Sequence, residues 1–238
     1  NPGLKAMARQ VRSLEYRRAQ AGRWSNPALE ISAEDWLGSG QFEGVDQVQL
    51  TAQLSQDLDI GGKRGAGAQV MSTRRDTAAW AYELARLQLQ LKTRRAFGDA
   101  LAAQENMRLR REEVELAQKV LEGVSAQAAA GRIYEEAALA WENARGALAA
   151  CWGAESPRFE ELRGAFLLGG GLPGEEEAIK SLREHPRLRK LQAMISTRRA
   201  QVEMERAKGV PDLSLSLGYR YLHGPGDSAM VAGVGMPI

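Results

Sequence analysis

The chain has 238 residues, of which 44% are hydrophobic, 26% are charged and 6% are aromatic, and its formal net charge is +2. This near balance of charge gives no electrostatic reason to expect a nucleic-acid partner. The single cysteine, Cys151, excludes an internal disulfide framework, and the two histidines leave little for a metal-binding or catalytic cluster. No apolar stretch approaches the roughly 20 residues of a membrane helix. Because the chain opens at Asn1-Pro2 without a signal peptide, we expect a mature or trimmed polypeptide.

A duplication relates the two ends of the chain. Two prolines, Pro2 and Pro27, recur at an offset of 184 positions, together with several apolar residues. Proline suits the first turn of a helix, and a later proline ends a helix by forcing the preceding residue into an extended conformation. We therefore predict a first-repeat helix over 1–25 and a second-repeat helix over 185–209. The matching pairs are Pro2 and Pro186, Pro27 and Pro211, Leu4 and Leu188, Val11 and Ile195, Leu29 and Leu213, and Ile31 and Leu215.

Alternation of apolar and polar residues follows each predicted helix. It is clearest over 48–54 in the first copy and over 213–221 in the second. A period of two residues is typical of a β-strand with one apolar and one polar face. We expect four strands, in a first hairpin over 26–60 and a second hairpin over 210–238. The aromatic residues expected to mark a membrane interface on these strands are Trp36, Tyr219 and Tyr221.

The polar face of these strands helps to distinguish a soluble sheet from a membrane barrel. One apolar face suits half of a soluble sandwich, but strands of roughly ten residues with a hydrophilic second face are typical of a membrane barrel with a water-filled lumen. Four strands cannot close a barrel, so several copies of the chain would have to assemble it. Glu30 and Glu34 are also of the residue type that serves acid–base catalysis or binds cations. The candidates for the lumen-facing surface are Glu30, Glu34, Gln47, Gln49 and Gln53.

The stretch between the strand pairs has the pattern of a coiled coil. Residues 66–130 contain no proline and repeat small apolar residues every seven positions, which predicts a long helix. Gly131 interrupts the pattern, and a second helix with the same spacing continues to Trp152. We therefore expect a helical hairpin over 61–152 with its turn near Gly131. Its return arm is shorter than its outbound arm, which indicates that residues are missing near 131–134.

Two glycine-rich segments flank this hairpin. Residues 153–184 begin with an irregular stretch, and a short helix is expected from about Glu175. The second glycine-rich segment begins at Gly61. It lacks the spacing of a phosphate-binding loop, and we interpret it as a flexible corner between a strand and a helix. The residues of this corner are Gly61, Gly62, Lys63 and Arg64.

The corner also carries a family resemblance. Residues 54–64, LSQDLDIGGKR, resemble the strand-to-helix junction of TolC-type outer membrane efflux proteins, and most of all the branch serving cobalt-zinc-cadmium and copper efflux pumps. The run NPAL at 26–29 and the pair Trp152-Gly153 fit the same family, as does the repeat architecture. The resemblance covers nearly the whole chain.

This resemblance implies both a fold and a function. The chain would be mainly α-helical with four membrane β-strands, and three copies would form a twelve-stranded barrel continued by a helical periplasmic tunnel. It would act as a passive conduit in the Gram-negative outer membrane, without enzymatic activity, cofactor or bound metal, and the branch implies heavy-metal cations as cargo. The implied partners are the other two protomers, outer membrane lipid, a periplasmic adaptor and an inner-membrane resistance-nodulation-division pump. Arg132 and Tyr134 are the candidates for the tip, where the adaptor would dock and the tunnel would close.

Other interpretations and departures from the family pattern remain. The main alternative is a periplasmic adaptor with a coiled-coil hairpin, although an adaptor predicts neither lipid-facing strands nor the duplication. A purely structural coiled-coil protein would leave the alternating strands unexplained. The family pattern also predicts a second helical hairpin after the second strand pair, and we expect this hairpin to be absent. No nucleophile–base pair or cofactor loop is recognisable, so we do not expect an enzyme.

Overall fold

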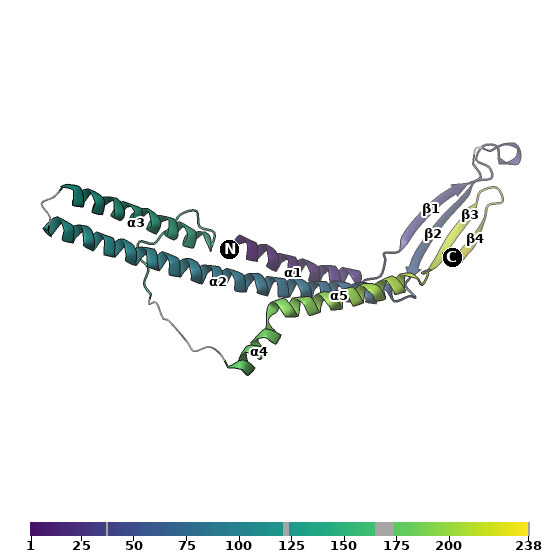
Figure 1. Ribbon diagram of the computed structural model, residues 1–238. Helices are drawn as coiled ribbons and strands as arrows, with labels where there is room; N and C mark the ends of the chain where they lie inside the picture. Colours follow the sequence, from purple (N-terminus) through teal and green to yellow (C-terminus); the bar gives the residue numbers. More distant parts are fainter. Residues whose placement is uncertain (37, 121–123, 165–173, 238) are drawn as a thin grey trace. The chain divides into compact units, whose positions relative to one another are not determined.

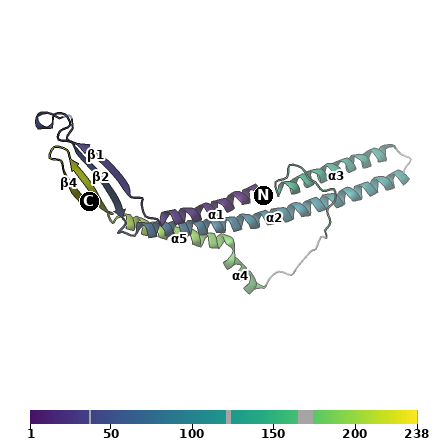
Figure 2. The ribbon, with the colours of Figure 1, turned by 180° about the vertical axis from the view of Figure 1, so that it is seen from behind.

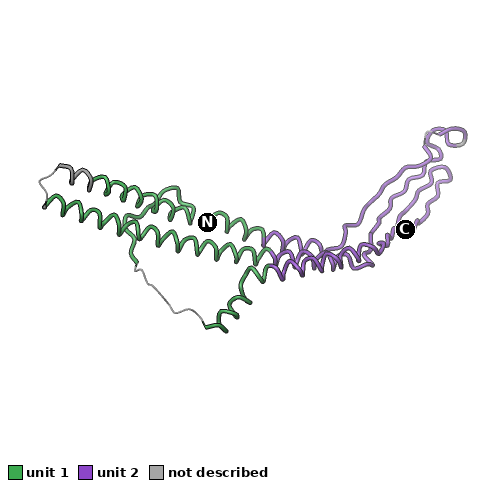
Figure 3. The backbone as a smooth tube through the Cα atoms, viewed as in Figure 1, with its two compact units in different colours: residues 1–10, 78–190 green, residues 11–77, 191–238 purple. Residues whose placement is uncertain are grey.

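The computed structural model describes residues 1–36, 38–120, 124–164 and 174–237. They form two compact units, residues 1–10 with 78–190 and residues 11–77 with 191–238 (Figure 3). Helices α1, α2 and α5 contribute residues to both units. The elements, labelled in Figure 1, are α1 (Pro2–Ala21), β1 (Ala28–Glu34), η1 (Gly40–Phe42), β2 (Gln49–Leu58), α2 (Lys63–Val120), α3 (Val124–Ala150), α4 (Glu175–Glu184), α5 (Pro186–Lys208), β3 (Leu213–Leu222) and β4 (Asp227–Gly235).

The duplication is visible in how the two repeat helices begin. Both α1 and α5 start at the predicted prolines. Before Pro2, the Asn1 Oδ1 atom accepts hydrogen bonds from the backbone N–H groups of Gly3, at 2.9 Å, and Leu4, at 3.4 Å. At the corresponding place in the second copy, His185 Nδ1 accepts from the backbone N–H of Arg187, at 3.2 Å. A side chain therefore satisfies first-turn N–H groups in each copy.

The first unit is built on the hairpin of α2 and α3, as the heptad spacing predicts. Ala100 on α2 packs with Trp141 and Leu148 on α3, and all three side chains are buried. The small residues of this seam allow the two helices to approach closely.

The predicted turn near Gly131 is wrong. Gly131 lies inside α3, which is continuous through 131–134, and the connection falls on residues 121–123, outside the described residues. Glycine inside a helix costs only about 1 kcal/mol relative to alanine. The three alanines that precede Gly131 in the sequence are strong helix formers, so this cost is tolerated.

The irregular segment that follows α3 is held against the hairpin by polar contacts. The Gln104 side chain pairs with the backbone of Leu162 in both directions, with N···O distances of 2.8 and 2.6 Å. The Arg145 guanidinium donates to the Phe159 carbonyl oxygen. Helix α4 then begins at Glu175, where the sequence predicts it.

The second unit contains a four-stranded antiparallel sheet in the order β1-β2-β3-β4 (Figures 1 and 2). The four predicted strands are therefore confirmed, and the two hairpins pair through β2 and β3. Strand β1 is shorter than predicted, with seven residues. It ends before Asp35, whose positive φ of 57° breaks the extended conformation. Trp36 consequently lies outside the strand where the sequence placed it.

Three helical segments pack closely in the same unit, namely the end of α1, the start of α2 and α5 (Figures 1 and 2). A Cβ atom on Gly67 of α2 would lie 3.8 Å from Ala21 Cβ and 4.0 Å from Met204 Cε. The hydroxyl oxygens of Thr77 and Thr197 are 3.2 Å apart. Small side chains thus set a short spacing between the helices. None of the helices in the described part of the chain has a segment long and apolar enough to cross a membrane.

The core of the first unit gives a stability prediction. Trp141 is only 4% exposed and fills the seam beside Ala100. Replacing it with alanine leaves a cavity, and we expect Trp141→Ala to lower the free energy of unfolding in detergent by about 3–5 kcal/mol. Trp141→Phe retains an aromatic ring and should lose less than half of this amount. Equal losses for the two variants, or none for alanine, would contradict this packing.

Candidate functional site: a two-faced sheet and its helix junction

One face of the sheet carries the polar side chains of β1, β2 and β3. Residues opposite each other on neighbouring strands share a face. Glu30 on β1 lies opposite Gln53 on β2, and Glu34 lies opposite Gln49. Four of the five residues predicted to face a lumen are therefore brought together on one face. The fifth, Gln47, lies in a turn before β2.

Arg220 is the polar-face residue that the sequence analysis missed. Its Nε donates to Thr51 Oγ1, at 3.0 Å, and its NH1 atom donates to Gln49 Oε1, at 3.2 Å. Its NH2 atom is 3.9 Å from a carboxylate oxygen of Glu34. These partners are about 170 to 190 positions away in the chain, and only the pairing of β2 with β3 brings them to Arg220. Alternation predicts the face of this arginine but not its partners.

The opposite face carries large apolar side chains that nothing in the described chain covers. Ile31 on β1 and Val234 on β4 are each 73% exposed. Tyr219 and Tyr221 lie on this face too, as expected for interface aromatics. The exposed apolar residues of the face are Leu29, Ile31, Leu50, Leu54, Leu215, Leu217, Tyr219, Tyr221, Met230 and Val234.

Burial on the two faces is the reverse of that in a water-soluble protein. Along β3 the apolar positions 215, 217, 219 and 221 are exposed, whereas their polar-face neighbours are buried or half-buried. Thr51, on the polar face of β2, is one of the buried polar residues in the described part of the chain. Soluble proteins rarely leave so large a contiguous apolar surface in contact with water. The apolar face is therefore built to contact another apolar phase or another chain.

The edges of the sheet are unpaired within the described residues. Strand β1 pairs only with β2, and β4 only with β3. Each edge leaves a row of backbone N–H and C=O groups available for a further strand. The sheet is consequently open at both sides in a single chain.

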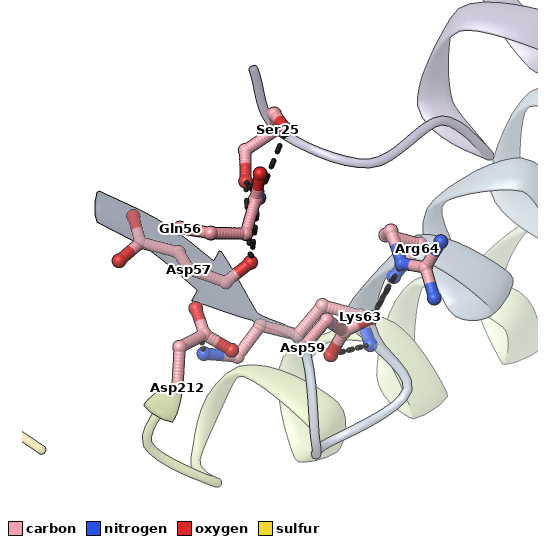
Figure 4. A network of polar contacts seen from close by, with 7 residues as sticks. All are labelled: Ser25, Gln56, Asp57, Asp59, Lys63, Arg64 and Asp212. Atoms are coloured by element: carbon pink, nitrogen blue, oxygen red, sulfur yellow. Dashed lines mark hydrogen bonds and ion pairs between the residues drawn. The ribbon is translucent and has the colours of Figure 1, made fainter. Parts of the chain in front are cut away.

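The corner between β2 and α2 is organised by Asp59 (Figure 4). Its two carboxylate oxygens accept hydrogen bonds from the backbone N–H groups of Lys63 and Arg64, each at 2.8 Å. The Asp59 side chain is only 9% exposed, and its second carboxylate oxygen is 3.5 Å from Arg64 Nε. The hydrogen bond from the Arg64 N–H is the main reason that the pKa of Asp59 lies below its usual value, with further help from Lys63 N–H and the Arg64 charge. The carboxylate thus satisfies first-turn N–H groups of α2.

The two basic residues of the corner have separate partners in the same unit. Lys63 Nζ lies 3.0 Å from a carboxylate oxygen of Asp212, which immediately precedes β3. The Arg64 guanidinium lies 3.4 Å from the ring centroid of Trp24, a cation–π contact. The corner therefore connects the first repeat with the second, and its side chains hold the glycine-rich segment in place.

The structure requires glycine at both Gly61 and Gly62, for a different reason at each position. Gly62 has a φ of +72°, which favours glycine. A Cβ atom on Gly61 would lie 2.7 Å from the Ala207 carbonyl oxygen and 2.8 Å from Val210 Cβ. Any side chain at Gly61 would push the corner away from the end of α5. The predicted strand-to-helix corner is thus a closely packed contact between the two repeats.

A second group of polar contacts joins the strands beside this corner (Figure 4). The Gln56 amide donates to the carbonyl and hydroxyl oxygens of Ser25, each at 3.0 Å. The Asp57 carboxylate accepts from the Ser214 hydroxyl on β3. These bonds fix the start of the sheet next to the helices.

The two residues proposed for the tip, Arg132 and Tyr134, lie in α3, outside the sheet and its helix junction. Arg132 is exposed and Tyr134 is half-buried, and both are inside α3 instead of at a turn. Their predicted place beside the turn is wrong for the same reason as the turn near Gly131. Among the described residues, no three histidine, cysteine, aspartate or glutamate side chains are grouped to hold a metal ion.

Comparison with known proteins defines the class. The model of the outer membrane efflux protein family matches residues 1–153. The cobalt-zinc-cadmium resistance protein CzcC of Cupriavidus metallidurans is 28% identical over 256 residues, covering 100% of this chain and 60% of CzcC. The nickel and cobalt resistance protein CnrC of the same organism is 29% identical over 253 residues, covering 98% of this chain and 59% of CnrC. The chain thus spans about 60% of the length of these curated relatives.

Solved structures show the same fold. The CmeC outer membrane channel of Campylobacter jejuni has a TM-score of 0.71 at 17% identity, covering 100% of this chain and 58% of CmeC. A membrane protein from Pseudomonas aeruginosa has a TM-score of 0.69 at 16% identity, covering 100% and 63% of the two chains. The long helical hairpin of α2 and α3 and the four β-strands therefore belong to the same fold as these two proteins. The chain belongs to the outer membrane efflux protein family, which confirms the predicted family and its outer membrane location.

Asp59 gives a pH-dependent prediction. Because its pKa is lowered on folding, the stability it contributes is present above the ordinary aspartate pKa of about 4 and is lost as the pH falls through the folded-state pKa. We expect Asp59→Asn to reduce the free energy of unfolding by about 1–2 kcal/mol at pH 7, and by less at a second, acidic pH below the ordinary aspartate pKa, where the wild-type carboxylate becomes protonated. Denaturant unfolding at both pH values measures the difference.

Asp76→Asn is the matched control for this experiment. Asp76 also lies on α2 and pairs with Arg75, at 3.3 Å, but its side chain is 46% exposed. A surface pair of this kind contributes at most about 1 kcal/mol. If Asp59→Asn behaved like Asp76→Asn at both pH values, the carboxylate would not stabilise the corner.

Proposed function

We propose that this chain is a protomer of a passive outer membrane channel in a tripartite efflux system. The inverted burial of the sheet is the observation that carries the proposal. An apolar face exposed to lipid and a half-buried polar face around water are the two surfaces of a membrane barrel strand. The open edges at β1 and β4 require neighbours, and lipid tolerates no unpaired edge.

Three copies supply the missing neighbours in this proposal. In each junction between protomers, β4 of one chain pairs with β1 of the next, and twelve strands close the barrel. The helices continue the barrel as a tunnel on the periplasmic side. The four strands are seven to ten residues long, close to the span that tilted strands need to cross a bilayer.

The partners and cargo follow from the family and from the named relatives. A periplasmic adaptor would contact the helical tip, and an inner-membrane resistance-nodulation-division pump would supply the energy. Heavy-metal cations are the proposed cargo, because the similar proteins CzcC and CnrC are metal-resistance proteins. We propose no enzymatic step, since a passive conduit needs none.

The adaptor alternative is the weaker proposal. An adaptor would share the helical hairpin of α2 and α3 with this chain. It would have no use for an open sheet whose apolar face is exposed from Leu29 to Val234. The family match over residues 1–153 also points to the channel component.

Planar-bilayer conductance of the purified mature protein tests this function. We expect a detergent-stable trimer that gives stepwise openings of uniform size, because the pore is shared by three chains. Cross-linking in detergent establishes the number of protomers in the same preparation. A protein that stays monodisperse without detergent and gives no openings would contradict the proposal and favour the adaptor.

A further inference from the structure

The polar face of the sheet has an uneven charge distribution. The four described strands contain four acidic residues and one basic residue, Arg220. The strand register places all five on the same face. The acidic residues are Glu30, Glu34, Asp57 and Asp227.

Arg220 lies at the end of the sheet away from the helix junction, where β1 ends and β2 begins. Glu34 is its charged neighbour, at 3.9 Å. Gln49 accepts from Arg220 and donates from its amide to Asp35, at 2.6 Å. The side chain of Arg220 is 33% exposed on this face. One positive charge is thus held among carboxylates at this end.

Glu30 lies nearer the middle of β1 and, among the described residues, has no positively charged neighbour like the one beside Glu34. It lies opposite the neutral Gln53, and in the described part of the chain it has no ion pair. The carboxylate at Glu34 is compensated and the carboxylate at Glu30 is not. A fixed charge along a narrow aqueous path raises the local concentration of ions of opposite sign.

We propose that Arg220 sets the charge selectivity of the channel by compensating Glu34 on the lumen side of the barrel. This inference rests on the proposed function, because the polar face must line the conducting path. With Arg220 in place, the charge of Glu34 is compensated, and the remaining carboxylates of the face, Glu30, Asp57 and Asp227, give the barrel a moderate preference for cations. Loss of the Arg220 charge leaves Glu34 uncompensated, and three such positions in a trimer raise the preference of the lumen for cations.

The competing explanation is that Arg220 only fastens the strands together. Its hydrogen bonds to Thr51 and Gln49 join β3 to β2 and would serve that purpose. Lysine in its place retains the positive charge but lacks the planar fork that makes both bonds. The pair of variants Arg220→Lys and Arg220→Gln therefore separates charge from strand cross-linking.

The experiment is the reversal potential of single channels in a tenfold KCl gradient. We expect Arg220→Gln to raise the ratio of potassium to chloride permeability at least about twofold and Arg220→Lys to leave it near the wild-type value. Glu34→Gln should lower the ratio, and the double variant Glu34→Gln/Arg220→Gln should restore it. Arg163→Gln is the control, because Arg163 pairs with Glu161 outside the sheet and should not change the ratio.

The outcomes are distinguishable. An unchanged ratio in Arg220→Gln, or an equal shift in Arg220→Lys, would overturn the selectivity role while leaving the channel function intact. Glu34→Gln tests the same charge balance without altering Arg220, so a folding defect of the arginine variants does not leave the inference undecided. Absence of openings in the unsubstituted protein would overturn the proposed function and this inference with it.

Discussion

The arrangement of this chain depends on one constraint, the need to cover the apolar face of an open sheet. Ten large apolar side chains on four strands are exposed, and burial of apolar surface contributes roughly 25 cal/mol per Å². The polar face already buries Thr51 and half-buries Arg220 within a single chain. The apolar side chains of the outer face need an apolar environment. The unpaired backbone groups of the edge strands need hydrogen bonds from further strands. A membrane-embedded assembly of several chains meets both requirements.

The strand-to-helix corner is the second element on which this arrangement relies. A membrane sheet and a helical segment meet there, so backbone N–H groups at the start of α2 need acceptors. Asp59 supplies them, while Lys63 and Arg64 contact Asp212 and Trp24. Gly61 permits the close approach of α5. The corner thus joins the two repeats through an ion pair, a cation–π contact and a close backbone approach.

Local patterns were sufficient to predict much of this fold. Proline position predicted where α1 and α5 begin, and alternation predicted the strands and the face on which Glu30, Glu34, Gln49 and Gln53 lie. The turn near Gly131 was wrong because a single glycine does not end a helix made of strong helix formers. Trp36 was misplaced because the left-handed conformation of Asp35 has no clear signal in sequence. In both cases a local signal at one residue was given the wrong weight in predicting where an element ends.

The residues that the sequence analysis missed have partners far along the chain. The role of Arg220 depends on its contacts with Thr51, Gln49 and Glu34. These contacts exist because β2 pairs with β3. Asp212 precedes the second hairpin, yet it binds Lys63 at the end of the first. A duplication suggests that the two copies meet, but it does not say which side chains touch. The missing information was the order of strands in the sheet.

The central claim is that the two faces of the sheet contact different phases, and accessibility along β3 tests it most directly. Single cysteines at 214, 215, 216, 217, 219 and 220, in a Cys151→Ala background, can be spin-labelled in the protein reconstituted in lipid vesicles. The structure predicts that labels at 215, 217 and 219 collide with oxygen dissolved in the lipid, and that labels at 214, 216 and 220 collide with a water-soluble nickel chelate. A uniform response along the strand, or the opposite alternation, would contradict the two-faced membrane sheet.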